Sequence, residues 1–587
     1  MVREVEWYMH AIRADFREIG ERLGIDPVMA RILVNRGQDT PEKQERYLYG
    51  TLGDIPSPSL LKNCDQAAEL LAEKIRGGRH IRIISDYDVD GVTSCCVLIK
   101  ALNRLGAVVS YDIPDRIRDG YGMNVRMVEE AARDGVDTLL TADNGTAAFE
   151  AVSRAKELGL TVIVTDHHQV QERLPEADLL INPWQPGCPY PFKEICGVEV
   201  AYKLMQVLSD KMEHPLPQGE YLEFVALGTV CDVMPIQEEN RIIVREGMRR
   251  MPDTENTGLR ALLSVNGLLD GKRIAVYHLG FILGPAINSE GRLSSAKEAM
   301  RLFLTEDPAE ADRMAEQMRE LNESRKAATT DGFDWAVGYL EEAGFVEDHV
   351  IVLCIPDLHE SLAGIVAGKL KERYYRPTIV FTASEEDPQL LKGSGRSIPD
   401  YDMFEALSRV KDHIVRFGGH KMAAGLTIRE TELEEFRRIL NAEDGLTEEQ
   451  LVEKVWLDVP MPLSYVTLSL AEQLEQLEPF GTGNEKPLFA EKGLLLRGLR
   501  KLGKNGTTLR LQVEDASKFR SELLLFQGEE LLNDIKMWSE QEDCDKMEVG
   551  FFKKPVYLDV MYEVSVNEFR GDRSVQCRLV HYRRTAG

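Results

Sequence analysis

The sequence has no CxxC pair among its nine cysteines. Cysteines at that spacing hold the metal of a zinc ribbon or form the redox centre of a thioredoxin-type protein, so the pattern argues against both classes. The scattered cysteines, including the adjacent Cys95 and Cys96, are expected to be small buried residues of a protein in a reducing compartment.

Long hydrophobic runs are also absent. No stretch approaches the ~20 apolar residues that a membrane span requires, and the charged N-terminal residues 1–20 do not resemble a signal peptide. The sequence shows no low-complexity tract and no repeat of fixed period. We therefore expect a cytoplasmic protein with no membrane association.

Positive charge is scarce: 71 Lys and Arg against 98 Asp and Glu give a formal net charge of −27. This balance argues against non-specific nucleic-acid binding by the whole surface. It leaves room for a local basic channel, and some of the acidic excess can be metal ligands. The 587 residues, 43% hydrophobic and 29% charged, are typical of a globular protein with two to four domains.

Short apolar runs alternate with helical patterns in the first half of the chain. The strands expected from these runs span 80–85, 108–113, 136–141 and 160–165. Helical segments of the length needed for crossover connections separate them, which predicts βαβ units and a mostly parallel sheet. A further apolar run at 223–228 has a helical pattern.

The second half of the chain changes character twice. A mainly helical stretch contains a long charged helix at 306–335, and a second α/β pattern follows at 348–430. After residue 455, short strands with Gly-rich turns predict a small β-barrel. The expected α/β architecture divides into an N-terminal helical segment (1–54), a parallel-sheet domain (55–250), a helical connector (251–345), a smaller α/β domain (346–440) and a barrel (455–587).

Acidic residues and histidines follow the expected strands of the first domain. The carboxyl ends of parallel strands open into one crevice, so these side chains are expected to converge there even though they are distant in sequence. A single carboxylate after a strand is more often a helix cap than a ligand, but four clusters in succession favour a site. The members are Asp86, Asp88, Asp90, Asp143, His167, His168 and Asp232.

Converging carboxylates repel one another and stay ionised together when cations hold them. Oxygen ligands with one or two histidines suit manganese or magnesium better than structural zinc. Two such ions about 3.5–4 Å apart can clamp the attacking and leaving oxygens of a phosphoryl displacement. A calcium loop starting at Asp86 is a poorer interpretation, because Val97 stands where that loop needs glutamate. The pattern predicts two-metal phosphodiester hydrolysis.

With the motif Asp166-His167-His168, these clusters resemble the DHH phosphoesterase superfamily. The resemblance implies a DHH domain and a DHH-associated domain that use two manganese or magnesium ions. It implies that Asp88 and Asp90 bind different ions, that Asp143 bridges them, and that His168 contacts the attacked phosphate or orients the water. The implied metal ligands are Asp86, Asp88, Asp90, Asp143, His167 and Asp232.

Within the superfamily, the order and spacing of motifs from about residue 55 onward resemble the RecJ exonuclease family. Residues 284–293 resemble its signature between the two domains, residues 393–397 and 416–420 resemble phosphate-gripping loops of the DHH-associated domain, and residues 477–484 resemble the entry to its OB-type domain. The resemblance implies a 5′-to-3′ exonuclease specific for single-stranded DNA, acting in DNA repair and recombination. A helicase and a single-strand-binding protein are the partners it suggests.

The resemblance also implies which residues contact the strand. In the Gly-rich segment 393–397, Ser394 and Arg396 are expected to hold a terminal phosphate, because small residues let backbone N–H groups approach and arginine forks onto phosphate oxygens. Without the resemblance, the same residues are better explained as a surface turn. His420 is expected to act in catalysis by hydrogen bonding to the scissile phosphate or its leaving oxygen.

Two arginines are weaker candidates for the substrate site. Arg116 is a candidate for recognition of the strand end. The family usually has arginine where this chain has Ala286, which leaves two alternatives: a lower affinity for DNA, or replacement of that contact by Arg292.

The barrel segment carries a local basic stripe inside the acidic chain. Such a stripe fits single-strand binding, in which basic residues follow the backbone and bases stack on aromatic rings, and it fits a merely solvated face equally well. The residues of the stripe are Lys492, Arg497, Arg500, Lys501, Lys504 and Arg510.

Two competing functions remain. Another DHH phosphoesterase, acting on very short oligonucleotides, cyclic dinucleotides or pyrophosphate, would share the metal motifs but would not need a C-terminal barrel. A non-catalytic scaffold would share the fold, although such a protein is expected to have lost some of the ligand residues that are all present here.

Overall fold

A computed structural model describes residues 5–115, 120, 122–271, 273–293, 296–384, 387–503, 506–569 and 571–585, with the backbone alone described at 289–293. The chain divides into two compact units. One contains Met1–Met9 and Glu320–Trp456, and the other contains His10–Arg319 and Leu457–Gly587.

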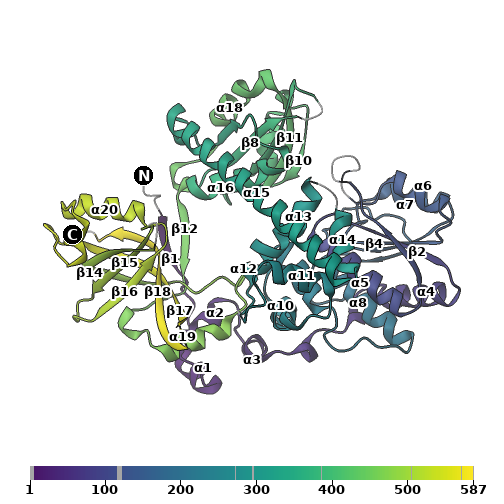
Figure 1. Cartoon of the computed structure of the whole chain (residues 1–587), viewed down its shortest axis with the longest axis horizontal. Helices are drawn as coiled ribbons and strands as arrows, with labels where there is room; N and C mark the ends of the chain where they lie inside the picture. Colours follow the sequence, from purple (N-terminus) through teal and green to yellow (C-terminus); the bar gives the residue numbers. More distant parts are fainter. Residues whose placement is uncertain are drawn as a thin grey trace. The chain divides into compact units, whose positions relative to one another are not determined.

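A five-stranded parallel sheet forms the centre of the first α/β domain (Figure 1). Its order is β3-β2-β4-β5-β6, and all four expected strands are confirmed to within two residues. The shortest strand, β6, has no clear pattern in the sequence. The strands are β2 (His80–Ser85), β3 (Val108–Asp112), β4 (Thr138–Ala142), β5 (Thr161–Thr165) and β6 (Leu179–Ile181).

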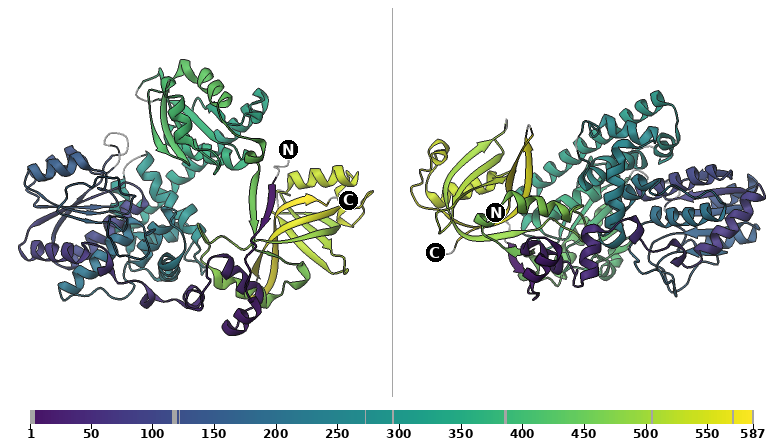
Figure 2. Two further views of the ribbon diagram at one scale, coloured as in Figure 1. Left: turned by 180° about the vertical axis from the view of Figure 1, so that it is seen from behind. Right: turned by 90° about the horizontal axis from the view of Figure 1, so that it is seen from below.

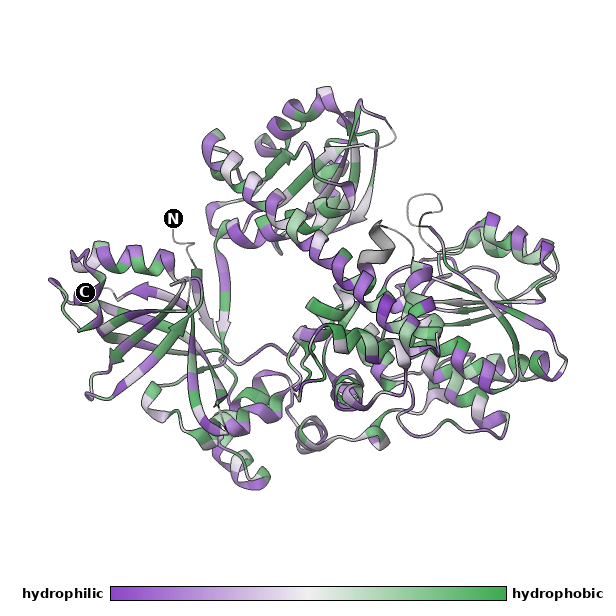
Figure 3. Cartoon of the chain, viewed as in Figure 1, coloured by the Kyte–Doolittle hydropathy of each residue, from purple (hydrophilic) through white to green (hydrophobic). Residues whose placement is uncertain are grey.

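Helices cover both faces of this sheet, as the two views of Figure 2 show. Alternate strand residues explain why: Ile83 joins the core on one face while its neighbour Ile84 joins the core on the other. Figure 3 shows the resulting hydrophobic strands between more polar helices. One face carries α4 (Cys64–Arg76), α5 (Val89–Arg104) and α8 (Gly197–Lys211), and the other carries α6 (Val125–Arg133) and α7 (Phe149–Glu157).

A buried ion cluster ties α8 to α10 (Glu238–Arg250). Lys203 Nζ lies 2.8 Å from Glu239 Oε2 and 3.2 Å from Glu199 Oε1, and the Tyr190 hydroxyl donates to Glu239 Oε2 at 2.7 Å. Burial opposes the charge on Lys203, but the two glutamates outweigh it and raise the pKa of the ammonium. The cluster holds α8 firmly, which matters because the first turn of α8 lies at the site described below.

The helical pattern at 223–228 is confirmed by α9 (Leu222–Cys231). Asp232 therefore follows a helix, and its placement after a strand is wrong. Eight of the ten residues of α9 are buried. A segment buried on nearly all sides has no polar face, so its sequence gives only a weak signal for a helix over a central strand. Asp232 follows the last turn of this buried helix.

The expected helical connector is confirmed, including its long charged helix. The elements are α11 (Thr257–Val265), α12 (Val276–His278), a π-helical turn η4 (Leu279–Leu283), α13 (Gly284–Leu293), α14 (Ala296–Leu304) and α15 (Pro308–Ala343). Ala286 lies in α13 and is fully buried. Among the residues that the structure describes, no helix is both long enough and apolar enough to cross a membrane.

The smaller α/β domain contains a five-stranded mixed sheet of order β10-β11-β9-β8-β7. Only β7 and β8 are parallel. Its strands are β7 (Ile351–Cys354), β8 (Thr378–Ala383), β9 (Leu390–Arg396), β10 (Arg416–His420) and β11 (Ala423–Arg429), and its helices are α16 (Ala363–Tyr374), α17 (Met403–Arg409) and α18 (Leu433–Ala442). The same unit pairs β1 (Val5–Met9) with β12 (Glu453–Leu457).

The C-terminal domain is a closed OB-type barrel, as expected from its short strands. The chain order β14-β15-β16-β18-β17 closes through a β14–β17 pairing, and β13 extends the sheet. The elements are β13 (Val459–Pro460), α19 (Leu468–Leu474), β14 (Phe489–Leu502), β15 (Thr508–Glu514), β16 (Arg520–Leu525), α20 (Glu529–Ser539), α21 (Cys544–Glu548), β17 (Tyr557–Phe569) and β18 (Asp572–Arg584).

Three N-terminal helices lie in the same unit as the barrel: α1 (Phe16–Leu23), α2 (Pro27–Asn35) and α3 (Pro41–Tyr49). Met29 and Leu33 of α2 share a hydrophobic core with barrel residues such as Phe489. The helical expectation for this N-terminal segment is therefore correct, apart from the strand β1.

Candidate metal centre

Two aspartates lie at the junction of β2 and α5. Asp88 caps α5, and its Oδ1 accepts a hydrogen bond from Gly91 N at 3.0 Å. Asp90 is buried, and its two carboxylate oxygens accept from Gly197 N at 2.6 Å and Val198 N at 2.9 Å. The first turn of α8 therefore fixes the orientation of Asp90 and supplies the positive end of a helix dipole.

Asp143 follows β4 in the left-handed backbone region, with a φ of 62°. Few residues other than glycine and asparagine adopt this conformation without cost. The turn directs the buried Asp143 carboxylate toward the other ligand candidates, and Gly197 makes room for it. A Cβ atom on Gly197 would lie 2.6 Å from Asp143 Cβ.

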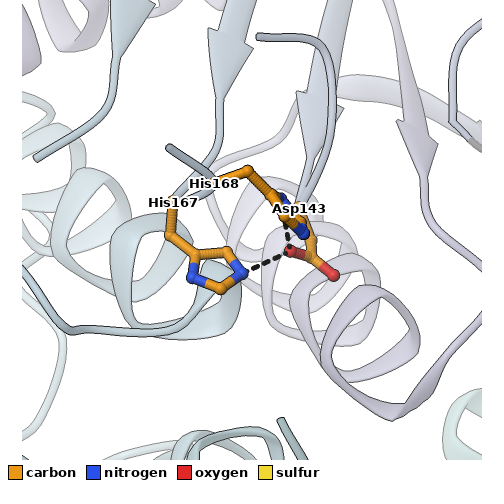
Figure 4. A group of neighbouring side chains, drawn as sticks. All are labelled: Asp143, His167 and His168. Carbon is orange, nitrogen blue, oxygen red and sulfur yellow. Dashed lines mark ion pairs between the residues drawn. The ribbon is translucent and has the colours of Figure 1, made fainter. Parts of the chain in front are cut away.

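The two histidines after β5 face the same carboxylate (Figure 4). His167 is buried, and its Nε2 lies 3.1 Å from Asp143 Oδ1, 3.4 Å from Asp232 Oδ2 and 3.6 Å from Asp90 Oδ2. His168 is nearly half exposed, and its Nδ1 lies 3.8 Å from Asp143 Oδ1. His167 thus lies among the carboxylates, while His168 lies at their solvent side.

Asp166 belongs to the motif, but it was not among the expected site residues. One of its oxygens accepts from the backbone N–H groups of His167 and His168 and lies 2.7 Å from His168 Nδ1. The other accepts from Thr146 N at 2.8 Å. Asp166 is therefore an orienting residue rather than a member of the ligand groups. Its position directly after β5 was the only signal for it in the sequence.

The candidate ligand atoms form overlapping groups whose members lie within 4.8 Å of one another. One group contains Asp90, His167 and Asp232, another contains Asp86, Asp88 and Asp143, and a third contains Asp143, His167 and His168. The 3.1 Å approach of Asp143 to His167 joins them. Asp143 and His167 therefore connect ligand candidates that come from different parts of the sequence.

The donor set fits divalent cations. Among the residues that the structure describes, the buried atoms His167 Nε2 and Asp232 Oδ2 have no hydrogen-bond partner. Buried polar atoms normally make hydrogen bonds, so two that make none at the centre of a carboxylate cluster fit a cation-binding site. Carboxylate oxygens with one or two imidazoles are the ligands expected for manganese or magnesium.

The protein alone leaves strong electrostatic repulsion at this site. Burial and the neighbouring Asp90 and Asp88 raise the pKa of Asp143 well above its ordinary value and raise the pKa of Asp232 to about 8. Burial, followed by Asp90, raises the pKa of Asp88 as well. Bound cations would remove this repulsion and return the carboxyl groups to their ionised form.

The two histidines differ in protonation because their environments differ. Burial lowers the pKa of His167, which suits a neutral metal ligand. Burial also opposes protonation of His168, but the hydrogen bond with Asp166 and the nearby carboxylates outweigh it and raise the pKa of His168 to about 9. In return, although burial opposes it, the contact with His168 lowers the pKa of Asp166 to about 2.

Ser394 and Arg396 lie on one face of β9, with the start of α16 beside them. A Cβ atom on Gly364 would lie 2.8 Å from Arg396 Nη2 and 3.4 Å from Ser394 Oγ. The expectation of a Gly-rich loop is wrong, because β9 pairs with strands on both sides. Its backbone groups are used by the sheet, so a phosphate could be held there by side chains.

The glycines of β9 also have a packing role that the sequence did not reveal. Added Cβ atoms would lie 2.5 Å from the ring of Phe381 at Gly393 and 3.2 Å from Met403 at Gly395. His420 likewise ends an edge strand, β10, rather than lying in a loop, and its side chain is exposed. Arg116 and the side chain of Arg292 lie outside the described residues.

Three arginines of the basic stripe have acidic neighbours. Arg497 Nη2 lies 2.6 Å from Glu514 Oε1, and Arg500 Nε lies 3.0 Å from Glu548 Oε1. Arg510 pairs more loosely with Glu522, at 3.8 Å, and Lys504 lies outside the described residues. These ion pairs favour the solvated-face interpretation of the stripe for the arginines involved.

Comparison with known proteins identifies three domains of the chain. Family models match residues 80–229 (DHH family, N-terminal domain), 347–443 (DHHA1 domain) and 457–581 (RecJ OB domain). The chain is 36% identical over 569 residues to the single-stranded-DNA-specific exonuclease RecJ of Bacillus subtilis, covering 96% of this chain and 69% of that protein.

The chain belongs to the RecJ family. It is 34% identical over 575 residues to the RecJ of Dickeya dadantii, covering 94% of this chain and 95% of that protein. Among solved structures, RecJ from Thermus thermophilus in complex with Mn²⁺ matches with a TM-score of 0.81 and 28% identity, covering all of this chain and 81% of that one. The Mg²⁺ complex matches with a TM-score of 0.76 and 27% identity, covering all of this chain and 79% of that one.

Proposed function

We propose that this chain is a metal-dependent exonuclease that degrades single-stranded DNA in the 5′-to-3′ direction during repair and recombination. The observation that supports it best is the set of overlapping ligand groups around Asp143 and His167, in a chain whose RecJ relatives are named single-stranded-DNA-specific exonucleases. Polarity and biological role come from the family resemblance.

The proposed ligands divide between two cations. Asp90, His167 and Asp232 would hold one, Asp86 and Asp88 the other, and Asp143 would bridge them. Two divalent cations supply Lewis acidity toward the phosphate and lower the pKa of a water nucleophile. The first turn of α8 keeps the Asp90 carboxylate in place through two backbone N–H groups, so the site needs little rearrangement to bind.

His168 is proposed as the catalytic residue at the solvent side of the cluster. Its raised pKa, about 9, favours an imidazolium that can donate to a phosphate oxygen, and Asp166 fixes the ring through Nδ1. This supports phosphate contact over the alternative of orienting the water. The positively charged imidazolium of His168 would also offset the negative charge that develops on the phosphoryl oxygens.

The smaller α/β domain is proposed to bind the strand. Ser394 and Arg396, on one face of β9, would hold the terminal phosphate, and His420 would contact the scissile phosphate or its leaving oxygen. Arg116 and Arg292 remain proposed substrate contacts on the basis of resemblance. The DHH domain would occupy about 55–250, the connector 251–345, the DHH-associated domain 346–440 and the OB-type domain 455–587.

The proposed substrate suggests where the chain acts and with what. A role on chromosomal DNA would place it in the cytoplasm of a bacterial cell. A helicase that opens the duplex, and a single-strand-binding protein that coats the product, stay predicted partners.

Digestion of single strands labelled at either end tests the proposal. With Mn²⁺ or Mg²⁺, we expect label at the 5′ end to be released first and blunt duplex to be resistant. Asp143→Ala should abolish both hydrolysis and tight Mn²⁺ binding, while Asp331→Ala, at a site on the connector helix α15, serves as the control.

Other outcomes would favour the competing functions. Preference for dinucleotides or pyrophosphate over long strands would indicate a small-substrate DHH phosphoesterase, although the closed OB-type barrel is more than such an enzyme needs. A chain that binds no Mn²⁺ in either form would be a scaffold. Release of 3′ label first would reverse the proposed polarity.

A further inference from the structure

Two threonine side chains join β4 and β5 near the proposed metal centre. The Thr165 hydroxyl donates to the Thr141 carbonyl at 2.6 Å, and the Thr141 hydroxyl accepts from Thr165 N at 3.2 Å. Both side chains are fully buried. The regular pairing of the two strands extends only to Leu140 and Ile163, so the hydroxyl groups connect the strands beyond their paired segment.

The same pair holds the turn that contains Asp143. Asp143 N donates to the Thr165 carbonyl at 3.1 Å, and the Thr141 hydroxyl donates to the Asn144 carbonyl at 2.6 Å. The backbone is therefore held on both sides of the Asp143 Cα atom, where φ is 62°. A left-handed conformation is costly for aspartate and persists only when surrounding contacts impose it. These two hydrogen bonds are such contacts.

Each threonine also precedes a ligand candidate by two residues. Thr141 precedes Asp143, and Thr165 precedes His167. The hydroxyl pair therefore sets the separation of two strand ends whose side chains meet, with Asp143 Oδ1 3.1 Å from His167 Nε2 (Figure 4). The pair has little room to shift, because a Cβ atom on Gly145 would lie 2.9 Å from Thr141 Oγ1.

We infer that Thr141 and Thr165 are positioning residues for the metal centre, and that their hydroxyl pair holds Asp143 and His167 where both can bind cations. The threonines act through the two ligand candidates and contact no ion themselves. This inference rests on the proposed function and adds which residues outside the ligand groups fix the geometry of the site. Replacing residues that orient metal ligands typically changes metal affinity or activity by about 10-fold to 100-fold.

A purely structural role is the alternative. Buried backbone N–H and carbonyl groups need hydrogen-bond partners, and the two hydroxyls supply some of them. If this were their whole role, removing a hydroxyl would lower stability and leave the Mn²⁺ affinity of the folded protein unchanged. The positioning role predicts instead that Mn²⁺ affinity depends on the presence of the hydroxyl, whatever happens to stability.

Valine and serine replacements separate the two roles. Thr141→Val keeps the branched shape and removes the hydroxyl, whereas Thr141→Ser keeps the hydroxyl and removes a methyl group. We expect Thr141→Val to weaken Mn²⁺ binding, measured by calorimetry, by about 10-fold to 100-fold and to lower kcat at saturating Mn²⁺. KM for single-stranded DNA should stay unchanged. Thr141→Ser should keep the wild-type Mn²⁺ affinity and kcat, although its melting temperature falls.

The second threonine and a third one on the same strand complete the set. Thr165→Val removes the donor to the Thr141 carbonyl and should also weaken Mn²⁺ binding, with Thr165→Ser restoring it. These two variants decide the question if Thr141→Val does not fold. Thr138→Val is the matched control, because Thr138 is buried at the other end of β4 and its hydroxyl donates to Asp137 Oδ1 at 2.7 Å. This control should keep the Mn²⁺ affinity and kcat of the wild type.

The outcomes distinguish this inference from the proposed function. Weakened Mn²⁺ binding in the valine variants of a protein that hydrolyses no single strand would contradict the proposed function and support the positioning role. Wild-type Mn²⁺ affinity in the folded valine variants would overturn the positioning role. An equal loss of affinity in Thr138→Val, or in the serine variants, would overturn it as well, because the loss would then not depend on these hydroxyls.

Discussion

His167 and His168 are neighbours in the chain but differ in protonation. His167 is buried, which lowers its pKa, whereas the contact of His168 with Asp166 raises the pKa of His168 to about 9. Asp166 therefore makes His168 a cationic residue that can contact a phosphate, while His167 stays a neutral ligand candidate. The roles of two identical side chains follow from what each touches.

The Asp166→Asn variant tests this coupling. An amide accepts a hydrogen bond but carries no charge, so we expect the pKa of His168 to fall from about 9 toward the ordinary histidine value, about 6.5. NMR titration of the metal-free protein measures it directly. We also expect kcat to fall by about 100-fold or more, as for loss of a positioned proton donor. An unchanged His168 pKa would show that other carboxylates control it.

Proton release on metal binding is expected from the raised carboxyl pKa values. Without metal, Asp232 with its pKa of about 8 is protonated at neutral pH, and a cation must displace that proton. The affinity for Mn²⁺ should therefore rise with pH up to about 8. Calorimetric titrations in buffers of different ionisation enthalpy would count the released protons, and heats that are independent of buffer would contradict this.

The folding stability of the metal-free protein is expected to depend on pH for the same reason. A carboxyl group whose pKa is higher in the folded protein than in the unfolded chain binds more protons in the folded state. This holds at pH values between its ordinary pKa, about 4, and its raised pKa. Its contribution therefore favours folding at low pH and is lost as pH rises toward about 8 for Asp232. Melting temperatures with and without Mn²⁺ should diverge as pH increases through this interval.

At the scale of elements, the start of α8 is as important to the site as the strands. Gly197 and Val198 hold Asp90 through their backbone N–H groups, and Gly197 leaves space for Asp143. The buried cluster around Lys203 anchors the same helix to α10. A helix end with a small first residue thus positions two ligand candidates that come from different strands.

Gly197→Ala is predicted to disturb both aspartates at once. The new methyl group would lie 2.6 Å from Asp143 Cβ, so α8 or Asp143 must move. We expect a destabilisation of about 1–3 kcal/mol, typical of overpacking, and Mn²⁺ binding weakened by about 10-fold or more. Thermal denaturation and Mn²⁺ titration measure the two effects.

Gly338→Ala provides the matched control. Gly338 lies in α15, and a Cβ atom there meets no atom within 4 Å. Alanine favours helix over glycine by about 1 kcal/mol, so this variant should be slightly more stable with unchanged Mn²⁺ affinity. Equal behaviour of the two variants would contradict the proposed role of Gly197.

At the scale of the whole molecule, one buried arginine joins three distant parts of the sequence. Arg241 on α10 donates to the carbonyl oxygens of Tyr47, Gln476 and Leu477 at 3.0, 2.7 and 2.8 Å, and its guanidinium lies 4.1 Å from the centre of the Tyr47 ring. It is only 2% exposed. The DHH domain, an N-terminal helix and the entry to the barrel therefore depend on one side chain.

Arg241→Met is expected to loosen this junction without touching the metal centre. Three carbonyl oxygens lose a donor, but the Leu477 oxygen keeps its hydrogen bonds from Tyr47 and Asn484, so we expect a loss of about 1–3 kcal/mol. Chemical denaturation should show the loss, and Mn²⁺ affinity should stay unchanged because the proposed ligands lie elsewhere in the unit. A variant as stable as the wild type would mean that water replaces the guanidinium.

The local pattern was sufficient to predict the sheet and most of the ligand candidates. The strands at β2, β4 and β5 have short apolar runs bounded by turn residues, and a parallel sheet must bring their carboxyl ends to one edge. Asp88, Asp143 and His167 could therefore be placed together before any coordinates. The long connector helix and the barrel were predictable for the same reason, since their periodicities are local.

The remaining features required the tertiary structure, because they depend on contacts between distant residues. The helix α9 is buried on nearly all sides and shows no polar face, so only the structure shows that Asp232 follows this helix rather than a strand. Three contacts are visible only once the chain is folded. Gly197 packs against Asp143, Asp166 orients His168, and Gly393 leaves room for the ring of Phe381. Sequence spacing identifies which side chains can meet, whereas close packing and hydrogen bonding decide how they meet and which of them take part in the chemistry.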